Sequence, residues 1–520
     1  MIRKILLFSA FIFSIHAVYA QGEMDAIKLS QNDLTGTARS VSMGGAFGAL
    51  GGDIGGIAIN PAGIGVYKSS EIVGTLNFQN VKTQTEMNGG KFNESKFKVN
   101  FDNIGFVTAL PTNNDVAPYI NFGISYNRLK NFDRKYSTGG SGLKWSMADY
   151  MAHRADGIKN PDEELWFQSD KDIYPLENHD WMAVFGYNSY LIGEVNGSPG
   201  QYTSLDQIPA NSTKYNLYNR EKGSISTYDF NMGTTFSDIV SIGLTFSVTD
   251  VKYHLYSDYN ESYGNLSNAG FGMENYLKTE GSGFQVSPGI IVKPIDELRI
   301  GLAYHSPTWY NLSDYVSAYF DYDLSGLIPG VQDNKGWIDT KTFRYDYRMR
   351  TPDKWTFSLA GVIGQTAIIS ADYEYTNYSD NMRVFDEHGD ALSYNPNPTI
   401  SKHYRGASTL RVGAEVRFTP QFSGRVGYAW MQSPFKTEFK DGKDEAMTVG
   451  SITQYTLDGD KNYFTYGLGY RFTRNFYTDI AFVMKNQKDD LQAFYTLNKE
   501  EGSQMKTNSF QGLLTLGYRF

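Results

Sequence analysis

Alternation between apolar and polar positions dominates the chain from about residue 70 to its end. Over residues 510–520 the even-numbered positions are aromatic or leucine apart from one glycine, whereas the odd-numbered positions are mainly polar or glycine. The same two-residue period recurs over residues 240–249, 410–418 and 464–472. Successive side chains of a β-strand point to opposite faces, so each stretch predicts a strand with one apolar face.

Short and long connections alternate between these strands, and this asymmetry indicates the fold. Six connections are short, around residues 111–115, 237–239, 293–297, 364–366, 419–421 and 473–475. Those between them are longer and polar, one of them spanning about residues 132–223. Outer-membrane barrels have short periplasmic turns, long external loops and an even number of strands. We therefore predict an all-β, transmembrane, antiparallel barrel over residues 67–520, with fourteen strands that start near residues 70, 94, 117, 224, 239, 280, 297, 340, 366, 404, 421, 462, 476 and 507.

The composition narrows the possible functions. The formal net charge of the 520 residues is −9 and no basic stripe offers a footprint for phosphates, so we expect no nucleic-acid binding. The absence of Cys excludes disulfides and thiolate metal sites. None of the seven His residues has a paired metal-ligand spacing, and no G-x-S-x-G elbow is present. We expect neither an enzyme nor a bound metal or cofactor.

Residues 1–20 have the features of a secretory signal peptide. Arg3 and Lys4 precede an apolar run at residues 5–15, and residues 17–20 supply a plausible cleavage site ahead of Gln21. No later stretch reaches the roughly 20 apolar residues that a membrane-spanning helix requires. We therefore expect export through a cleaved signal peptide and insertion into the outer membrane as a closed barrel, the alternative to helices that satisfies backbone hydrogen bonds in lipid.

The segment between signal and barrel, residues 21–66, does not alternate and is rich in small residues. Small residues let the backbone pack closely or bend sharply. A glycine-rich dinucleotide-binding loop is the obvious alternative for residues 44–56. It fails on context, because no strand precedes the glycines and no βαβ unit follows them.

Residues 39–65, with their small-residue run leading to Asn-Pro-Ala, resemble the N-terminal hatch of the outer-membrane long-chain fatty-acid transporter family, which also includes aromatic-hydrocarbon channels. Residues 302–308 and 351–355 support this resemblance, which covers essentially the whole exported chain. The family implies a hatch that plugs a fourteen-stranded barrel. It also implies passive uptake of hydrophobic small molecules, such as long-chain fatty acids, that leave sideways through the wall after the plug rearranges. The residues then expected to gate this plug are Asn60, Pro61, Ala62 and Gly63.

Charged residues and one His occupy the polar faces of the strands and are expected to line the lumen: Arg299, His305, Asp372, Glu374, Arg411, Glu415, Arg417, Arg425, Arg471 and Arg519. Crowded arginines repel unless carboxylates pair with them. We therefore interpret them as salt bridges holding plug to wall rather than as an anion filter. Asp372 and Glu374 lie two residues apart on one strand, which favours lumen lining over an acid–base pair.

Tyr518 and Phe520 end the last alternating strand and resemble the C-terminal signal that barrel-assembly machinery recognises. The expected partners are that machinery, a hydrophobic ligand, and the lipids and lipopolysaccharide of the outer membrane, with the chain itself a monomer. Two alternatives to transport remain open. One is a scaffold for surface or secretion complexes that docks through residues 132–223, and the other is a porphyrin or haem receptor.

Overall fold

The structure is a computed structural model that describes residues 22–87, 90–167, 180–205, 213–264, 269–327, 334–364, 366–392, 395–440, 444–496 and 502–520. The expected signal peptide, residues 1–20, lies outside the described residues. None of the helices within the described ranges is long and apolar enough to cross a membrane.

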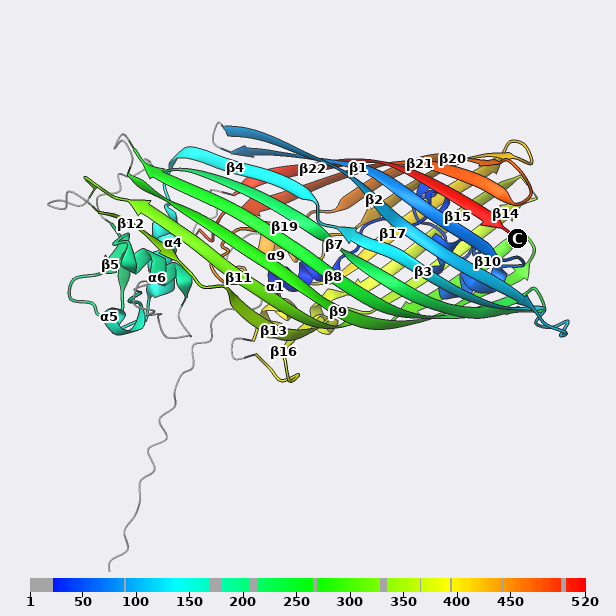
Figure 1. Cartoon of the computed structure of the whole chain (residues 1–520), viewed down its shortest axis with the longest axis horizontal. Helices are drawn as coiled ribbons and strands as arrows, with labels where there is room; N and C mark the ends of the chain where they lie inside the picture. Colours follow the sequence, from blue (N-terminus) through cyan, green and yellow to red (C-terminus); the bar gives the residue numbers. More distant parts are fainter. Residues whose placement is uncertain are drawn as a thin grey trace, which may run out of the picture.

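Fourteen antiparallel strands, several of them kinked, close into a barrel within the described ranges (Figure 1). In chain order the wall consists of β1 (Glu71–Met87), β2 (Gly90–Pro111), β3 (Tyr119–Asn131) with β4 (Arg134–Leu143), β7 (Thr213–Phe236), β8 (Val240–Tyr263), β9 (Gly270–Ile295), β10 (Leu298–His305) with β11 (Trp309–Asp323), β13 (Phe343–Arg350) with β14 (Lys354–Ile363), β15 (Ala367–Asn377) with β16 (Arg383–Asp386), β17 (Gly406–Arg417), β18 (Phe422–Met431), β20 (Lys461–Arg471), β21 (Phe476–Gln492) and β22 (Ser503–Arg519). The barrel closes because β1 pairs with β2 on one side and with β22 on the other. The predicted fourteen-stranded barrel is confirmed.

The six predicted short connections lie at one end of the barrel. They join β2 to β3, β7 to β8, β9 to β10, β14 to β15, β17 to β18 and β20 to β21. The C-terminal Phe520 lies at the same end, on the right of Figure 1. Short turns are periplasmic in barrels of this kind, so this end is the periplasmic end and the long connections are extracellular.

The last strand shows how the alternation maps onto the wall. Phe510, Leu516 and Tyr518 are 46%, 49% and 46% exposed, whereas Gln511 and Thr515 are only 4% and 1% exposed. The apolar residues therefore form the outer, lipid-facing surface, and the polar residues face a filled lumen. The predicted assignment of apolar residues to the lipid and of polar residues to the lumen is confirmed for this strand.

The long second loop is shorter than expected. Strands β4 and β7 extend through much of residues 132–223, which leaves the connection at residues 144–212. A barrel strand needs only about 9–11 residues to cross the membrane, yet β7 has 24 residues. Beyond the lipid both faces of a strand are free to be polar, so the apolar alternation disappears there although the strand continues.

The remaining connection folds against the extracellular mouth of the barrel. It carries α4 (Met147–Ala155), α5 (Pro161–Glu164), α6 (Trp181–Asn188) and two short strands, β5 (Ile192–Glu194) and β6 (Tyr202–Ser204), at the left of Figure 1. Phe185 of α6 stacks on Phe320 of β11 at 5.0 Å between ring centroids. These rings belong to a large apolar cluster that also includes inward-facing residues of β7, β8 and β9.

Candidate plug and substrate path

Residues 22–66 fill the lumen as a series of short elements: α1 (Glu23–Ser30), α2 (Ala38–Ser42), α3 (Ile54–Ile57) and a 3-10 helix, η1 (Pro61–Val66). Asp53 caps α3 by accepting hydrogen bonds from Gly55 N (2.9 Å) and Gly56 N (3.3 Å). Ala38, Ala46 and Ala49 have no exposed surface. The small residues noted in the sequence therefore lie where backbone, rather than long side chains, packs against the wall.

Inward-facing glycines of the barrel receive the plug backbone. A Cβ atom added at Gly427 of β18 would lie 2.1 Å from Gly44 N, and one added at Gly243 of β8 would lie 2.1 Å from Pro61 O. The register places Gly413 opposite Gly427, and Gly289 opposite Gly243. These cross-strand pairs leave the wall without side chains where the plug touches it. The sequence pattern places Gly243 and Gly413 on the polar faces of their strands, but it did not predict this role.

Wall side chains also bind the plug backbone. Asp372 of β15 accepts hydrogen bonds from Phe47 N and Gly48 N, both at 3.0 Å. Asn121 of β3 donates to Ile64 O at 2.8 Å. The plug is thus attached to opposite parts of the wall through its backbone groups.

Asn60, Pro61, Ala62 and Gly63 lie at the bend that starts η1, and all four are buried. The Asn60 side chain accepts a hydrogen bond from Ala62 N at 3.1 Å. It also donates to Gly48 O at 2.6 Å and to Ile290 O of β9 at 3.2 Å. One amide therefore holds the bend, a distant part of the plug and the wall together.

A buried ion-pair chain joins plug and wall near the periplasmic side. Arg39 of α2 contacts Glu415 of β17 at 3.1 Å, and Glu415 contacts Arg425 of β18 at 2.6 Å. Arg425 in turn contacts Asp479 of β21 at 2.6 Å. Arg411 forms a separate pair with Glu374 across β15 and β17, at 2.9 Å. The sequence analysis did not select Arg39 or Asp479, since pairing between segments so far apart leaves no local pattern.

The other selected residues fall into two groups. Arg299 donates to Leu50 O at 2.7 Å, His305 Nε2 lies 3.1 Å from Ile59 O, and Arg519 pairs with Glu71 at 2.8 Å. Arg417 and Arg471, by contrast, are exposed at the periplasmic end and form no ion pair within the described part of the chain. The expected salt bridges are therefore absent for these two, because solvent at the barrel mouth screens their charges.

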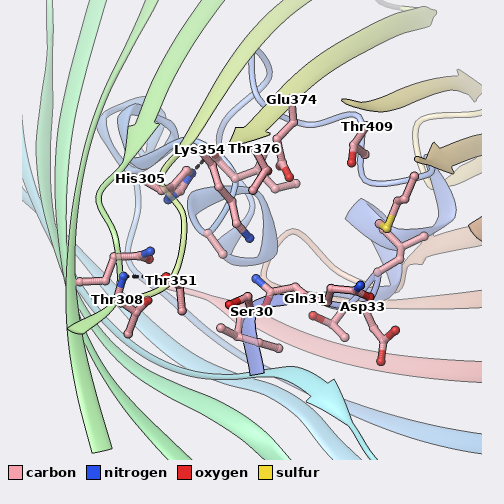
Figure 2. A pocket seen from close by; sticks show the side chains of 18 of the residues that line it. Ser30, Gln31, Asp33, His305, Thr308, Thr351, Lys354, Glu374, Thr376 and Thr409 are labelled. Atoms are coloured by element: carbon pink, nitrogen blue, oxygen red, sulfur yellow. Dashed lines mark hydrogen bonds between the residues drawn. The ribbon is translucent and has the colours of Figure 1, made fainter. Parts of the chain in front are cut away.

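A cavity of about 180 Å³ lies between the plug and the wall, lined by residues of α1 and by Thr308, Thr351 and Glu374 among others. Figure 2 shows Lys354 of β14 reaching into this cavity with its amino group directed toward Ser30 and Gln31. Lys354 is half-buried, and its amino group has no hydrogen bond or ion pair to any residue that the structure describes. The cavity therefore contains an amino group that makes no direct contact with a carboxylate, although Glu374 lines the same cavity.

A second cavity of about 120 Å³ lies on the other side of α1 and shares Gln31, Asp33 and Lys461 with the first. Its lining combines charged residues of both signs with apolar side chains. The cations are Lys28, Lys130, Arg134, Lys461 and Lys485, the carboxylates are Asp25, Asp33, Asp133, Glu221 and Asp458, and the apolar residues include Met24, Ile27, Leu255, Leu277, Phe435, Val449 and Ile452. Lys485 pairs with Asp33 at 3.3 Å, and Lys28 pairs with Asp25 at 3.5 Å. The second cavity is thus amphipathic.

The wall is interrupted beside this second cavity. Pairing between β2 and β3 ends at Asn103 and Asn127, after which the chain turns inward through Phe132 and continues as β4, which pairs with β7. Phe132 is 4% exposed and lines the second cavity together with Asn131. Backbone pairing between β2 and β3 therefore stops next to the second cavity, where the chain of β3 continues as β4.

A buried His holds the start of the plug to the extracellular loops. His403 Nδ1 lies 2.9 Å from both carboxylate oxygens of Glu23, and its Nε2 lies 3.3 Å from Asp444. Burial raises the pKa of the Glu23 carboxyl despite its hydrogen bond with His403. The hydrogen bond from Lys402 lowers the pKa of Asp444. No group of three or more potential metal ligands occurs among the described residues.

Comparison with known families identifies the chain. The model of the family described as outer membrane protein transport protein (OMPP1/FadL/TodX) matches residues 222–520, more than half of the chain. The chain belongs to this family. Membership and the closed barrel together place it in the outer membrane, with the apolar belt against lipid.

Related proteins are distant in sequence. The 47 kDa outer membrane protein of Pasteurella multocida is 26% identical over 245 residues, which cover 46% of this chain and 50% of that protein. Outer membrane protein P1 of Haemophilus influenzae is 24% identical over 225 residues, 36% of this chain and 47% of that protein. The matched part of the chain spans about half the length of these relatives.

Two solved structures share the fold of this OMPP1/FadL/TodX member. A FadL homologue of Pseudomonas aeruginosa superposes with a TM-score of 0.54 at 13% identity, covering 94% of this chain and 100% of that one. The toluene transporter TodX of Pseudomonas putida has a TM-score of 0.50 at 12% identity, covering 94% and 99%. At such identities the likeness concerns the fold alone.

Proposed function

We propose that this protein is a passive outer-membrane channel for hydrophobic molecules that carry an acidic head, such as long-chain fatty acids, and that its N-terminal plug is the gate. Family membership supports uptake across the outer membrane in general terms. The observation that carries the narrower proposal is the pair of cavities around α1: Lys354 projects into the first (Figure 2), and four lysines line the second beside apolar side chains.

A fatty acid matches both halves of this lining. Its carboxylate pairs with a lysine amino group, and a hydrogen bond to a charged group contributes about 1.5–3 kcal/mol. Lys354 makes no direct ion pair among the described residues of the first cavity. In the second cavity Lys130 donates to Lys28 O at 2.6 Å and Lys461 donates to the side-chain oxygen of Gln31, so both amino groups are bound to uncharged acceptors. The acyl chain gains roughly 0.8 kcal/mol for each CH₂ group that it buries against apolar side chains such as Leu255 and Leu277.

The size of the cavities requires the plug to move. Ligand-binding pockets usually measure about 300–1,000 Å³, whereas these cavities measure about 180 and 120 Å³. α1 separates the two, so its displacement would merge them into one elongated space. We assign the gate to rearrangement of the plug around Asn60, Pro61, Ala62 and Gly63, because the Asn60 amide links the bend to both Gly48 and β9.

The proposed exit leads sideways through the wall where pairing between β2 and β3 stops. Phe132 and Asn131 line the second cavity and follow the residues of β3 that pair with β2, so the proposed route from that cavity passes these two side chains. A lateral route suits a hydrophobic molecule, because it reaches lipid without crossing water. Internal cavities also favour transport over the scaffold alternative, for which a solid lumen is expected.

Deletion of residues 22–50, with residues 1–21 retained, tests the proposal. The strands satisfy their own backbone groups, so the barrel should still assemble and show heat-modifiable gel mobility. Uptake of a labelled fatty acid should change, and liposome swelling should show increased passage of small polar solutes. A truncated barrel that assembles and matches the intact protein in both assays would exclude these residues as a plug.

A further inference from the structure

A groove of about 350 Å³ lies on the outer surface of the wall, away from the lumen path. Its lining includes Phe284 of β9, Trp309 of β11, and Arg348 and Arg350 of β13. Phe284 and Trp309 stack at 4.9 Å between ring centroids and are 46% and 39% exposed. The groove therefore has an aromatic floor and a cationic side.

Strand register explains how these residues meet. Directly opposite residues on neighbouring antiparallel strands share one face of the sheet. Phe284 is opposite Trp309, Trp309 is opposite Arg350, and Arg350 is opposite Arg383 of β16. Four strands thus present one continuous row, from two aromatic rings to two guanidinium groups.

The side chains of Arg350 and Arg383 carry like charges on directly opposite residues. Like charges directly opposite each other in a sheet destabilise it, and no described carboxylate lies within ion-pair distance of Arg348, Arg350 or Arg383. Their hydrogen-bond partners among the described residues are backbone carbonyls: Arg350 donates to Asn381 O at 3.1 Å, and Arg383 donates to Met382 O at 2.7 Å. An anion between the two guanidinium groups would remove the repulsion.

The row lies at the extracellular edge of the apolar belt. On β8, outward-facing Val248 is opposite Phe284, and the next outward positions toward the extracellular end are Asp250 and Lys252. On the periplasmic side the outward surface continues through exposed Phe357 of β14. The arginines therefore face the level at which headgroups of the outer leaflet begin.

We propose that this groove binds a phosphorylated glycolipid of the lipid A type, with a phosphate between Arg350 and Arg383 and an acyl chain along Phe284 and Trp309. Arginine forks bind phosphate oxygens in pairs, and aromatic residues favour the boundary between headgroups and acyl chains. Because the groove lies at the extracellular edge of the apolar belt, a lipid bound there belongs to the outer leaflet. This glycolipid is the phosphate-bearing lipid of that leaflet. The proposal does not depend on transport, because the groove is outside the barrel.

Native mass spectrometry of the purified barrel tests this inference with added lipid A, dephosphorylated lipid A or phosphatidylglycerol. The Arg350→Gln/Arg383→Gln variant should bind lipid A at least tenfold more weakly than the unaltered protein. Arg344→Gln is the matched control, because Arg344 lies on β13 and already pairs with Asp346 at 3.0 Å. Heat-modifiable mobility verifies assembly, and Arg348→Gln provides a second variant if the double one does not assemble.

Three results would overturn the inference. These are equal lipid A binding by the double variant and the control, equal binding of dephosphorylated lipid A, or phosphatidylglycerol binding as strong as that of lipid A.

Discussion

Replacement of Gly427 by Ala tests whether the plug depends on bare backbone in the wall. Gly427 faces the lumen on β18, and its new Cβ would lie 2.1 Å from Gly44 N and 2.2 Å from the carbonyl carbon of Met43. Both are backbone atoms of the plug, and Gly44 itself has a φ of +67°, which few other residues adopt. Because the new methyl group would meet backbone atoms of the plug, rotation of a side chain cannot relieve the close contact.

The expected effect is large enough to measure. Ordinary van der Waals contact begins near 3.4 Å, so the plug must retreat by more than 1 Å. Overpacking of this kind costs about 1–3 kcal/mol. The cost falls on the plugged state alone, because an open lumen accommodates the methyl group. A difference of 2 kcal/mol changes the ratio of plugged to open barrels by about thirtyfold.

Liposome swelling with a small sugar measures this change, and Gly361→Ala is the matched control. Gly361 lies on β14, and a Cβ added there has no neighbour within 4 Å. We expect the Gly427 variant to swell faster while both variants keep the heat-modifiable mobility of an assembled barrel. If the two variants swell equally slowly, the close contact does not hold the plug in place and the reasoning is wrong.

The remaining predictions concern Lys354, the neighbouring residues Leu514 and Thr515, and Phe520. Lys354→Gln should lower the affinity for a fluorescent fatty acid about 10–100-fold, the equivalent of one charged hydrogen bond, without changing the affinity for its methyl ester. Leu514→Arg should reduce assembly in the membrane, because arginine at the lipid midplane costs about 2–4 kcal/mol. Thr515→Arg should instead give an assembled but leaky barrel, because Thr515 accepts a hydrogen bond from Ala38 N of the plug at 2.8 Å; equal mobility shifts for both variants would contradict the face assignment. Deletion of Phe520 should lower the amount of barrel in outer-membrane fractions, and unchanged levels would exclude it from the assembly signal.

The lipid-facing part of the fold could be predicted from the sequence because lipid imposes a strict rule. Every second residue of a membrane-crossing strand must be apolar, so stretches such as residues 464–472 can be recognised as strands from their alternation. Where strands leave the lipid, as β7 does over residues 213–223, that rule no longer applies. The strand continues there with its backbone hydrogen bonds to β4 and β8, which no local pattern records.

The plug and its partners were predictable in outline only. The small residues before Asn60 indicated a closely packed segment, and the polar faces indicated which side chains point inward. The pairing of Arg39 with Glu415 joins positions 376 residues apart, so it depends on the whole barrel being closed. Lys354 and the lysines around Asp33 were missed for the same reason, because each occurs singly in its own stretch of sequence.

A reversible lock between plug and wall tests the central claim most directly. A Cβ added at Gly48 would lie 3.1 Å from the Cβ of Ser358 on β14. Disulfide-bonded cysteines have Cβ atoms about 3.5–4.5 Å apart, so a small shift allows a bond between Gly48→Cys and Ser358→Cys. The chain has no Cys of its own, and each single variant serves as a control. If the plug is the gate, oxidation should abolish fatty-acid uptake by the double variant alone, and a reducing agent should restore it. Uptake that continues at the same rate with the disulfide formed would contradict a plug-gated channel.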